Sequence, residues 1–113
     1  MRIASLRLHA VVPSRDYAIR STSPDIARKQ LWGYTLDRSC ASAFLLALTA
    51  EHVDFESGHE RFFVVAPDVA SDENVEVLIG RTYQGVPLRM ELKGKKGLFD
   101  CSKAERLLGW QHE

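Results

Sequence analysis

The sequence predicts an α/β fold that contains at least one pair of parallel strands. Strand patterns and helix patterns alternate three times along the 113 residues, which is the order typical of α/β proteins. The run Phe62–Ala66 is continuously apolar rather than alternating, as in a parallel strand covered on both faces. With 45% hydrophobic and 27% charged residues, the chain has the composition of one globular domain.

The first element is a strand that ends at Pro13. Every even position from Ala4 to Val12 is apolar, which indicates a strand over Ile3–Val12. Because so apolar a strand is normally covered on both sides and this one has no lead-in, we expect the chain to be a truncated copy of a larger protein. Residues 14–30 have the composition of an exposed loop, with one helical turn expected over Pro24–Lys29.

A long helix is expected in the middle of the chain. Leu31–Leu36 reads as a short extended piece, and the Asp37 carboxylate is placed to cap a helix from Arg38 to about Glu51. Small and large apolar residues surround most of this helix, so we expect it to be buried on more than one side.

Three further elements complete the predicted order. Ser71 or Asp72 caps a helix that runs to about Tyr83, with one apolar face. Val86–Leu92 alternates like a half-buried strand, and its proline favours an edge position. The spacing Ser102 to Glu105 is that of a capping box, and Gly109 ends the last helix. The apolar face expected on the helix before Tyr83 consists of Val75, Leu78, Ile79 and Tyr83.

Charge and cysteine usage exclude several kinds of partner. The 15 basic and 15 acidic residues give a net charge of +0, so we expect neither nucleic acid nor a membrane surface as a partner. Cys40 and Cys101 are far apart and outside any C-x-x-C motif, and no signal peptide or membrane span is visible, which favours a cytoplasmic protein.

No catalytic, cofactor-binding or metal-binding set is complete in this chain. A dinucleotide site needs a glycine-rich turn such as G-x-G-x-x-G, and none is present. None of the three tyrosines is followed four residues later by lysine, and the four histidines lack metal-ligand spacing. The chain alone is therefore expected to hold no catalytic residue, cofactor or metal.

Four weaker signals each leave two interpretations open. The basic turn Lys93–Gly97 is able to touch a phosphate, although a solvated loop is favoured. Cys40 lies near a helix start that would activate a thiol, but its apolar neighbours favour an inert core cysteine. A cap explains Asp37 better than a ligand contact does. Three aromatic residues are favoured as packing residues over stacking platforms: Trp32, Tyr34 and Trp110.

Four segments, read together, resemble the C-terminal third of the NAD-dependent epimerase/dehydratase family, the extended short-chain dehydrogenases that act on nucleotide sugars. The closing pattern S-K-A-x-R-x-L-G-W is the most characteristic of them. In order, the segments are Ala4–Pro13, Trp32–Ala41, Phe62–Asp68 and Ser102–Trp110.

The resemblance implies late strands and helices of a Rossmann-type parallel sheet plus part of a small substrate lobe. Residues 1–13 would form a late sheet strand, 14–30 a loop, and 31–113 the closing helix, a strand and substrate-lobe elements. Pro13 and Tyr34 would then lie near the substrate. The chain departs from the family just before Pro13, where Ala10 and Val12 stand in place of an asparagine and a glycine that are frequent there.

The resemblance also implies a parent oxidoreductase that uses NAD or NADP and acts on a nucleotide sugar or a related small molecule. The family's glycine-rich loop and catalytic Tyr-x-x-x-Lys lie upstream of the part that this chain resembles, so we expect the chain to be inactive alone. The alternative is an independent small α/β module that binds a partner protein or small ligand and carries out no redox chemistry.

Overall fold

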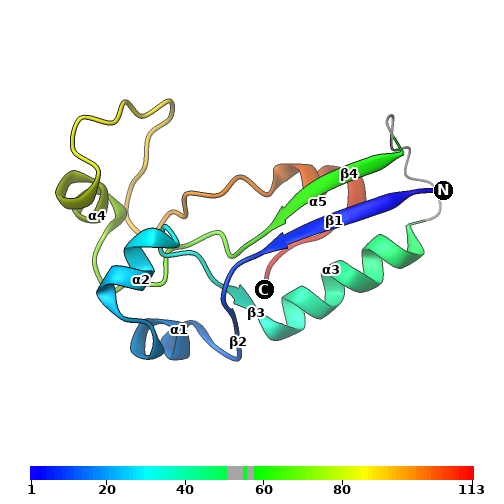
Figure 1. Cartoon of the computed structure of the whole chain (residues 1–113), viewed down its shortest axis with the longest axis horizontal. Coiled ribbons are helices and arrows are strands. Elements are labelled where there is room, and N and C mark those ends of the chain that lie inside the picture. The colour runs from blue at the N-terminus through cyan, green and yellow to red at the C-terminus, as the bar shows by residue number, and fades with distance from the viewer. Residues whose placement is uncertain (51–54, 56–57) are drawn as a thin grey trace.

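A computed structural model of the chain describes residues 1–50, 55 and 58–113 (Figure 1). It has an α/β fold in which helices pack beside two small parallel sheets. Its elements, in chain order, are β1 (Ile3–Leu8), β2 (Val11–Val12), α1 (Arg15–Ser21), α2 (Pro24–Lys29), β3 (Thr35–Leu36), α3 (Asp37–Thr49), β4 (His59–Val64), α4 (Val75–Thr82) and α5 (Ser102–Leu108). The expected end of the long helix at Glu51 lies outside the described residues.

Two parallel strand pairs form the sheets, which confirms the prediction of parallel pairing. β1 pairs with β4 from Ile3 opposite His59 to Leu8 opposite Val64. β2 pairs with β3, with Val11 opposite Thr35.

The single strand predicted over Ile3–Val12 is wrong, because the chain changes partner after Leu8. The amide of Thr35 donates to the carbonyl of Ala10 at 3.2 Å, and the chain after Ala10 pairs with β3 instead of β4. The Thr35 hydroxyl donates to the carbonyl of Val64 at 2.7 Å. This buried threonine therefore joins the two sheets.

The β1–β4 sheet is covered on one face. α3 and α5 pack against that face, where Phe62 and Val64 of β4 are fully buried. On the opposite face Ile3 is 47% exposed and Phe63 is 38% exposed. The expectation that both strands are covered on both sides is therefore wrong for this chain, since no described element covers the second face.

The expectation that the long helix is buried on several sides is also wrong. Within α3 only Ser39 and Ala43 are buried, while Phe44, Leu45 and Leu48 are 49%, 61% and 82% exposed. The helix also begins one residue earlier than predicted. Asp37 is its first residue, and the Asp37 carboxylate accepts from the next amide at 2.7 Å.

The stretch predicted as a loop, residues 14–30, folds into α1 and α2. The Ser14 hydroxyl accepts from the amide of Tyr17 at 3.1 Å, and the Ser23 hydroxyl accepts from the amide of Ile26 at 3.4 Å. These serines are helix caps, and a cap satisfies amides that a helix start otherwise leaves without partners. The expected helical turn at Pro24–Lys29 is confirmed as α2.

The predicted extended piece Leu31–Leu36 is mostly a turn. Leu31 and Trp32 have φ angles of 52° and 54°, in the left-handed region. Only its last two residues, Thr35 and Leu36, are in a strand, β3.

The second half of the chain follows the predicted order except for one strand. α4 buries Val75 and Leu78 against Trp32 and Val69, which confirms its apolar face. The strand predicted over Val86–Leu92 is wrong, because the segment is irregular and no strand in the described part of the chain pairs with it.

The last helix, α5, is confirmed, and it ends as predicted at Gly109 with a φ of 69°. Its predicted capping box does not form, because Ser102 is already helical. The Asp100 carboxylate accepts from the amide of Ser102 at 2.9 Å instead.

No helix in the described part of the chain is long and apolar enough to cross a membrane.

Candidate functional site

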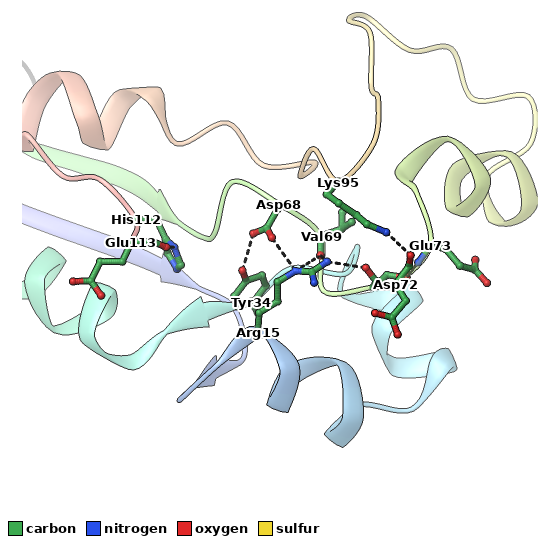
Figure 2. Close-up of polar contacts among 10 residues, drawn as sticks. Arg15, Tyr34, Asp68, Val69, Asp72, Glu73, Lys95, His112 and Glu113 are labelled. Carbon is green, nitrogen blue, oxygen red and sulfur yellow. Dashed lines mark hydrogen bonds and ion pairs between the residues drawn. The ribbon is translucent and has the colours of Figure 1, made fainter.

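The candidate site lies where β1 and β4 end. Because these strands are parallel, the chain leaves both of them at the same edge of the sheet, and ligands of open α/β sheets bind at that edge. His9 follows β1, the segment Val65–Asp68 follows β4, and Tyr34 enters from the turn before β3. Figure 2 shows the polar contacts of Asp68 with Tyr34 and Arg15.

Asp68 is at the centre of a polar network that joins the buried Tyr34 to the partly exposed Arg15. One carboxylate oxygen lies 2.8 Å from Nε of Arg15, and the other accepts from the Tyr34 hydroxyl at 2.7 Å. Arg15 also donates to the carbonyl of Val69 at 2.8 Å and to that of Ser71 at 2.7 Å. The network therefore ties α1 to the segment after β4, and most donors of the Arg15 guanidinium are already used.

Tyr34 is held as a neutral hydrogen-bond donor. Its side chain is 4% exposed, and burial raises the pKa of Tyr34 strongly, followed by the hydrogen bond to Asp68 and the negative charge of Asp68. A phenol with a raised pKa does not ionise near neutral pH, so Tyr34 is unsuited to act as a base. It positions Asp68 instead.

His112 closes the network on the other side of Tyr34. Its ring meets the Tyr34 ring edge-on at 5.8 Å. Its Nε2 accepts from the amide of Leu36 at 3.0 Å, and its Nδ1 donates to the carbonyl oxygen of Glu113 at 2.8 Å. These two contacts fit the neutral tautomer protonated on Nδ1.

A hollow of about 400 Å³ opens beside His112 at this edge of the sheet. The described residues that line it include Asp100, Glu105 and Ser102 but no lysine or arginine. Anionic groups such as phosphate are repelled by such a wall, whereas a neutral ligand with several hydroxyl groups finds acceptors there. Cys101 also faces this hollow.

The thiols are not activated. Burial raises the pKa of Cys101, whose thiol donates to the carbonyl of Val65 at 3.4 Å. Burial likewise raises the pKa of Cys40. Since the thiolate is the reactive form, both cysteines are poor nucleophiles. For Cys40 this agrees with the inert thiol expected from the sequence.

His9, at the end of β1, lies against Phe99 with 4.5 Å between the ring centroids. Burial lowers the pKa of His9. The neutral form of this ring is therefore favoured, and its contact with Phe99 is one of packing.

A second hollow, of about 540 Å³, lies between α2 and α4. Its described lining includes the buried Trp32, three acidic residues and two basic residues. Arg81 donates to Glu73 at 2.7 Å, and Arg28 pairs with Asp25. These two ion pairs leave Asp72 as the remaining charged residue, so the hollow offers no preference for an anionic ligand.

The basic turn Lys93–Gly97 is largely occupied by contacts within the chain. The amide of Gly94 donates to the carboxylate of Glu76 at 2.7 Å, and the Lys95 ammonium donates to the carbonyl of Asp72. These contacts favour the interpretation of a structural loop over a phosphate site. Among the described residues no group of three histidine, cysteine or acidic side chains is placed to hold a metal ion.

The structure places the two expected substrate-binding residues differently. Tyr34 lies inside the network with Asp68, while Pro13 stays exposed at the surface, two residues before Arg15. Trp32, Tyr34 and Trp110 are all buried, at 6%, 4% and 2% exposure, which agrees with their interpretation as packing residues.

Sequence reasoning missed Arg15 and Asp68. Strand pairing gave no signal for their contact, because Arg15 follows β2 and Asp68 follows β4, and these strands belong to different sheets. The two side chains meet only because the tertiary structure brings the start of α1 against the segment after β4.

Compared with protein-family models, curated proteins and solved structures, the chain gives no match.

Proposed function

We propose that this chain supplies the closing strands and part of the substrate lobe of an NAD(P)-dependent oxidoreductase of the epimerase/dehydratase type. In this proposal the sheet belongs to a larger Rossmann-type sheet. The parent enzyme moves a hydride between NAD or NADP and a nucleotide sugar or related small molecule. The chain itself contributes to the substrate side, near Pro13 and Tyr34.

The observation that carries the proposal is the one-sided cover of the parallel β1–β4 pair. Parallel strands occur almost only in sheets covered on both faces, whereas the second face here exposes Ile3 and Phe63. The outer side of α3 adds an exposed apolar surface, formed by Phe44, Leu45 and Leu48. Both surfaces suit a sheet that is completed by further strands and helices.

The candidate site supports a substrate role at the carboxyl edge. The hollow beside His112 is lined by acidic and hydroxyl side chains, and no described lysine or arginine lines it, which suits the hydroxyl groups of a sugar. Pro13 leads from β2 into α1, whose first residue, Arg15, pairs with Asp68 in the segment after β4. The chain's own residues would therefore bind and orient a substrate, while the hydride chemistry belongs to the cofactor held by the rest of the enzyme.

Amide hydrogen exchange on the isolated chain tests the proposal. We expect Ile3–Leu8 to exchange fast relative to α3, because one edge and one face of β1 are open in this chain. Strong protection of Ile3–Leu8 in a monomer would overturn the proposal and favour an independent α/β binding module.

Calorimetric titration gives a second test. We expect no measurable binding of NAD(H) to the chain, since no glycine-rich phosphate loop is present in its sequence. Micromolar binding would contradict the assignment of the cofactor site to another part of the enzyme.

The gene offers the most direct test. In the same reading frame upstream of Met1, or in an adjoining exon, we expect a Tyr-x-x-x-Lys and a glycine-rich loop. Their absence would remove the main support for a catalytic parent.

A further inference from the structure

Residues 86–92 carry a strand pattern that the fold leaves without a strand partner. Val86, Leu88 and Met90 alternate with polar residues or proline and are 55%, 54% and 61% exposed. Within residues 1–50, 55 and 58–113, no hydrogen bond is made by the main-chain amides of Leu88, Met90 or Leu92. An exposed apolar segment with unpaired amides is a template for adding another strand. In Figure 1 the segment lies in the yellow loop that leads away from α4.

We propose that two copies of this chain associate through residues 86–92, which pair as antiparallel strands about a two-fold axis at Met90. In this register the residue numbers of each facing pair sum to 180. Met90 faces Met90 of the second copy, Leu88 faces Leu92, and Arg89 faces Glu91.

Charge complementarity selects this register. An axis at Met90 produces two cross-strand pairs of opposite charge, Arg89 with Glu91 and the symmetric equivalent. An axis at Arg89 would place two arginines opposite each other, and an axis at Glu91 would place two glutamates opposite each other. Opposite charges facing across a strand pair stabilise it, whereas like charges destabilise it.

Pro87 fits the same register. In antiparallel pairs, hydrogen-bonded and non-hydrogen-bonded positions alternate along the strand. If Met90 occupies a hydrogen-bonded position, then Leu88 and Leu92 do as well, and Pro87 falls at a position whose nitrogen points away from the partner. A proline is tolerated there because no ladder bond is lost.

The interface is small, so the dimer is weak. Each copy contributes three exposed apolar side chains, which falls short of the roughly 800 Å² per partner of a stable interface. The chain also bends at Arg89 and Met90, and this bend has to straighten on pairing. The Glu91–Lys93 ion pair has side chains that are 74% and 76% exposed, so its loss costs little. We expect a dimer that forms only at high protein concentration.

Sedimentation equilibrium of charge variants tests the register. Arg89→Glu and Glu91→Arg each create two like-charge pairs, and each is expected to weaken the dimer about tenfold. The double variant R89E/E91R restores opposite charges across the axis and is expected to return the dissociation constant to within about twofold of the original value. Failure of the double variant to recover would overturn the register. A wild-type chain that stays monomeric at millimolar concentration would overturn the proposal and leave the segment to a different partner.

Disulfide trapping provides an independent readout. Facing Cα atoms at a hydrogen-bonded position lie about 5.5 Å apart, within the range that a disulfide spans. Met90→Cys is therefore expected to form a covalent dimer at least tenfold faster than Leu88→Cys, whose two copies would lie more than about 10 Å apart in this register. The two positions have nearly equal exposure, which makes Leu88→Cys a matched control. The wild-type chain serves as the blank for Cys40 and Cys101. Equal rates, or faster trapping of Leu88→Cys, would overturn the register.

Discussion

At the scale of single residues, Asp68 joins parts of the chain that are far apart in sequence. It accepts a hydrogen bond from Tyr34, which is buried, and forms an ion pair with Arg15, which is half-buried. The carboxylate is 33% exposed, so solvent weakens the ion pair. The hydrogen bond to the buried hydroxyl of Tyr34 is the more consequential contact, since a buried donor without an acceptor is costly.

Replacing Asp68 tests this assignment. Asp68→Ala leaves the Tyr34 hydroxyl without its acceptor and is expected to lower the free energy of unfolding by about 1–3 kcal/mol. Tyr34→Phe removes the hydroxyl itself and is expected to cost about 0.5–1.5 kcal/mol. In urea unfolding the double variant should lose less than the sum of both, because the same contact is removed twice. Additive losses would show that the hydrogen bond contributes little.

The raised pKa of Tyr34 predicts a dependence of stability on alkaline pH. In the unfolded chain this phenol ionises around its ordinary pKa of 10.0, while in the folded chain it stays protonated. Ionisation above pH 10 therefore favours the unfolded chain. The stabilisation is complete below the unfolded pKa and is lost as the pH rises beyond it.

Tyr34→Phe lacks this titration. The difference in unfolding free energy between the wild type and Tyr34→Phe should be constant below about pH 9. By pH 11 the wild type should have lost stability relative to Tyr34→Phe. Urea unfolding of both proteins across this range measures it. A difference that stays constant up to pH 11 would contradict the assignment.

At the scale of elements, local end signals decide where helices stop and start. Ser14 and Ser23 begin α1 and α2, and Gly109 ends α5 in the left-handed conformation. A Cβ added at Gly109 would meet no neighbouring atom within 4 Å, so the strain of an alanine there comes from the backbone alone. An alanine at Gly109 therefore measures the free-energy cost of the left-handed backbone without a contribution from side-chain packing.

A pair of identical substitutions measures that cost. Gly109→Ala places alanine at a φ of 69° and is expected to lower the free energy of unfolding by about 1 kcal/mol. Gly80→Ala, in the interior of α4 and also with open space around it, is expected to raise it by about 0.5–1 kcal/mol. Thermal unfolding of both variants is the measurement. Effects of the same sign would contradict the role of Gly109 as the helix end.

At the scale of the whole molecule, the chain is extended rather than spherical. Its radius of gyration is 15.1 Å and its extents are 44 × 31 × 19 Å, whereas a globular chain of this length has a radius of about 13 Å. The buried residues that the structure describes form three separate clusters: one under the β1–β4 sheet, one around Tyr34, and one around Trp32. A flat shape with divided cores is what the proposed part of a larger enzyme would have.

Adjacent phenylalanines of β4 test the one-sided cover. Phe62 is fully buried, while Phe63 points to the open face and is 38% exposed. Phe62→Ala is expected to cost about 3–5 kcal/mol, and Phe63→Ala about 1 kcal/mol. Urea unfolding at low protein concentration measures both. Equal costs would show that the second face is covered in solution.

The sequence by itself determined the class of fold and several elements. The continuous apolar run in β4 predicted parallel pairing, and the spacing of Val75, Leu78 and Tyr83 predicted the buried face of α4. Gly109 predicted the end of α5. The apolar face of α4 and the end of α5 depend on neighbours a few residues away, so periodicity and end signals are sufficient to find them.

Only the tertiary structure decided which segments pair and which side chains meet. The partner change after Leu8, the contact of Arg15 with Asp68 and the unpaired state of residues 86–92 all depend on segments distant in the chain. A strand pattern indicates that a segment is able to pair, but pairing also requires another strand close enough to share hydrogen bonds. Residues 86–92 have the pattern without a partner in the described chain, while residues 14–30 lacked an obvious pattern and were ordered by two serine caps.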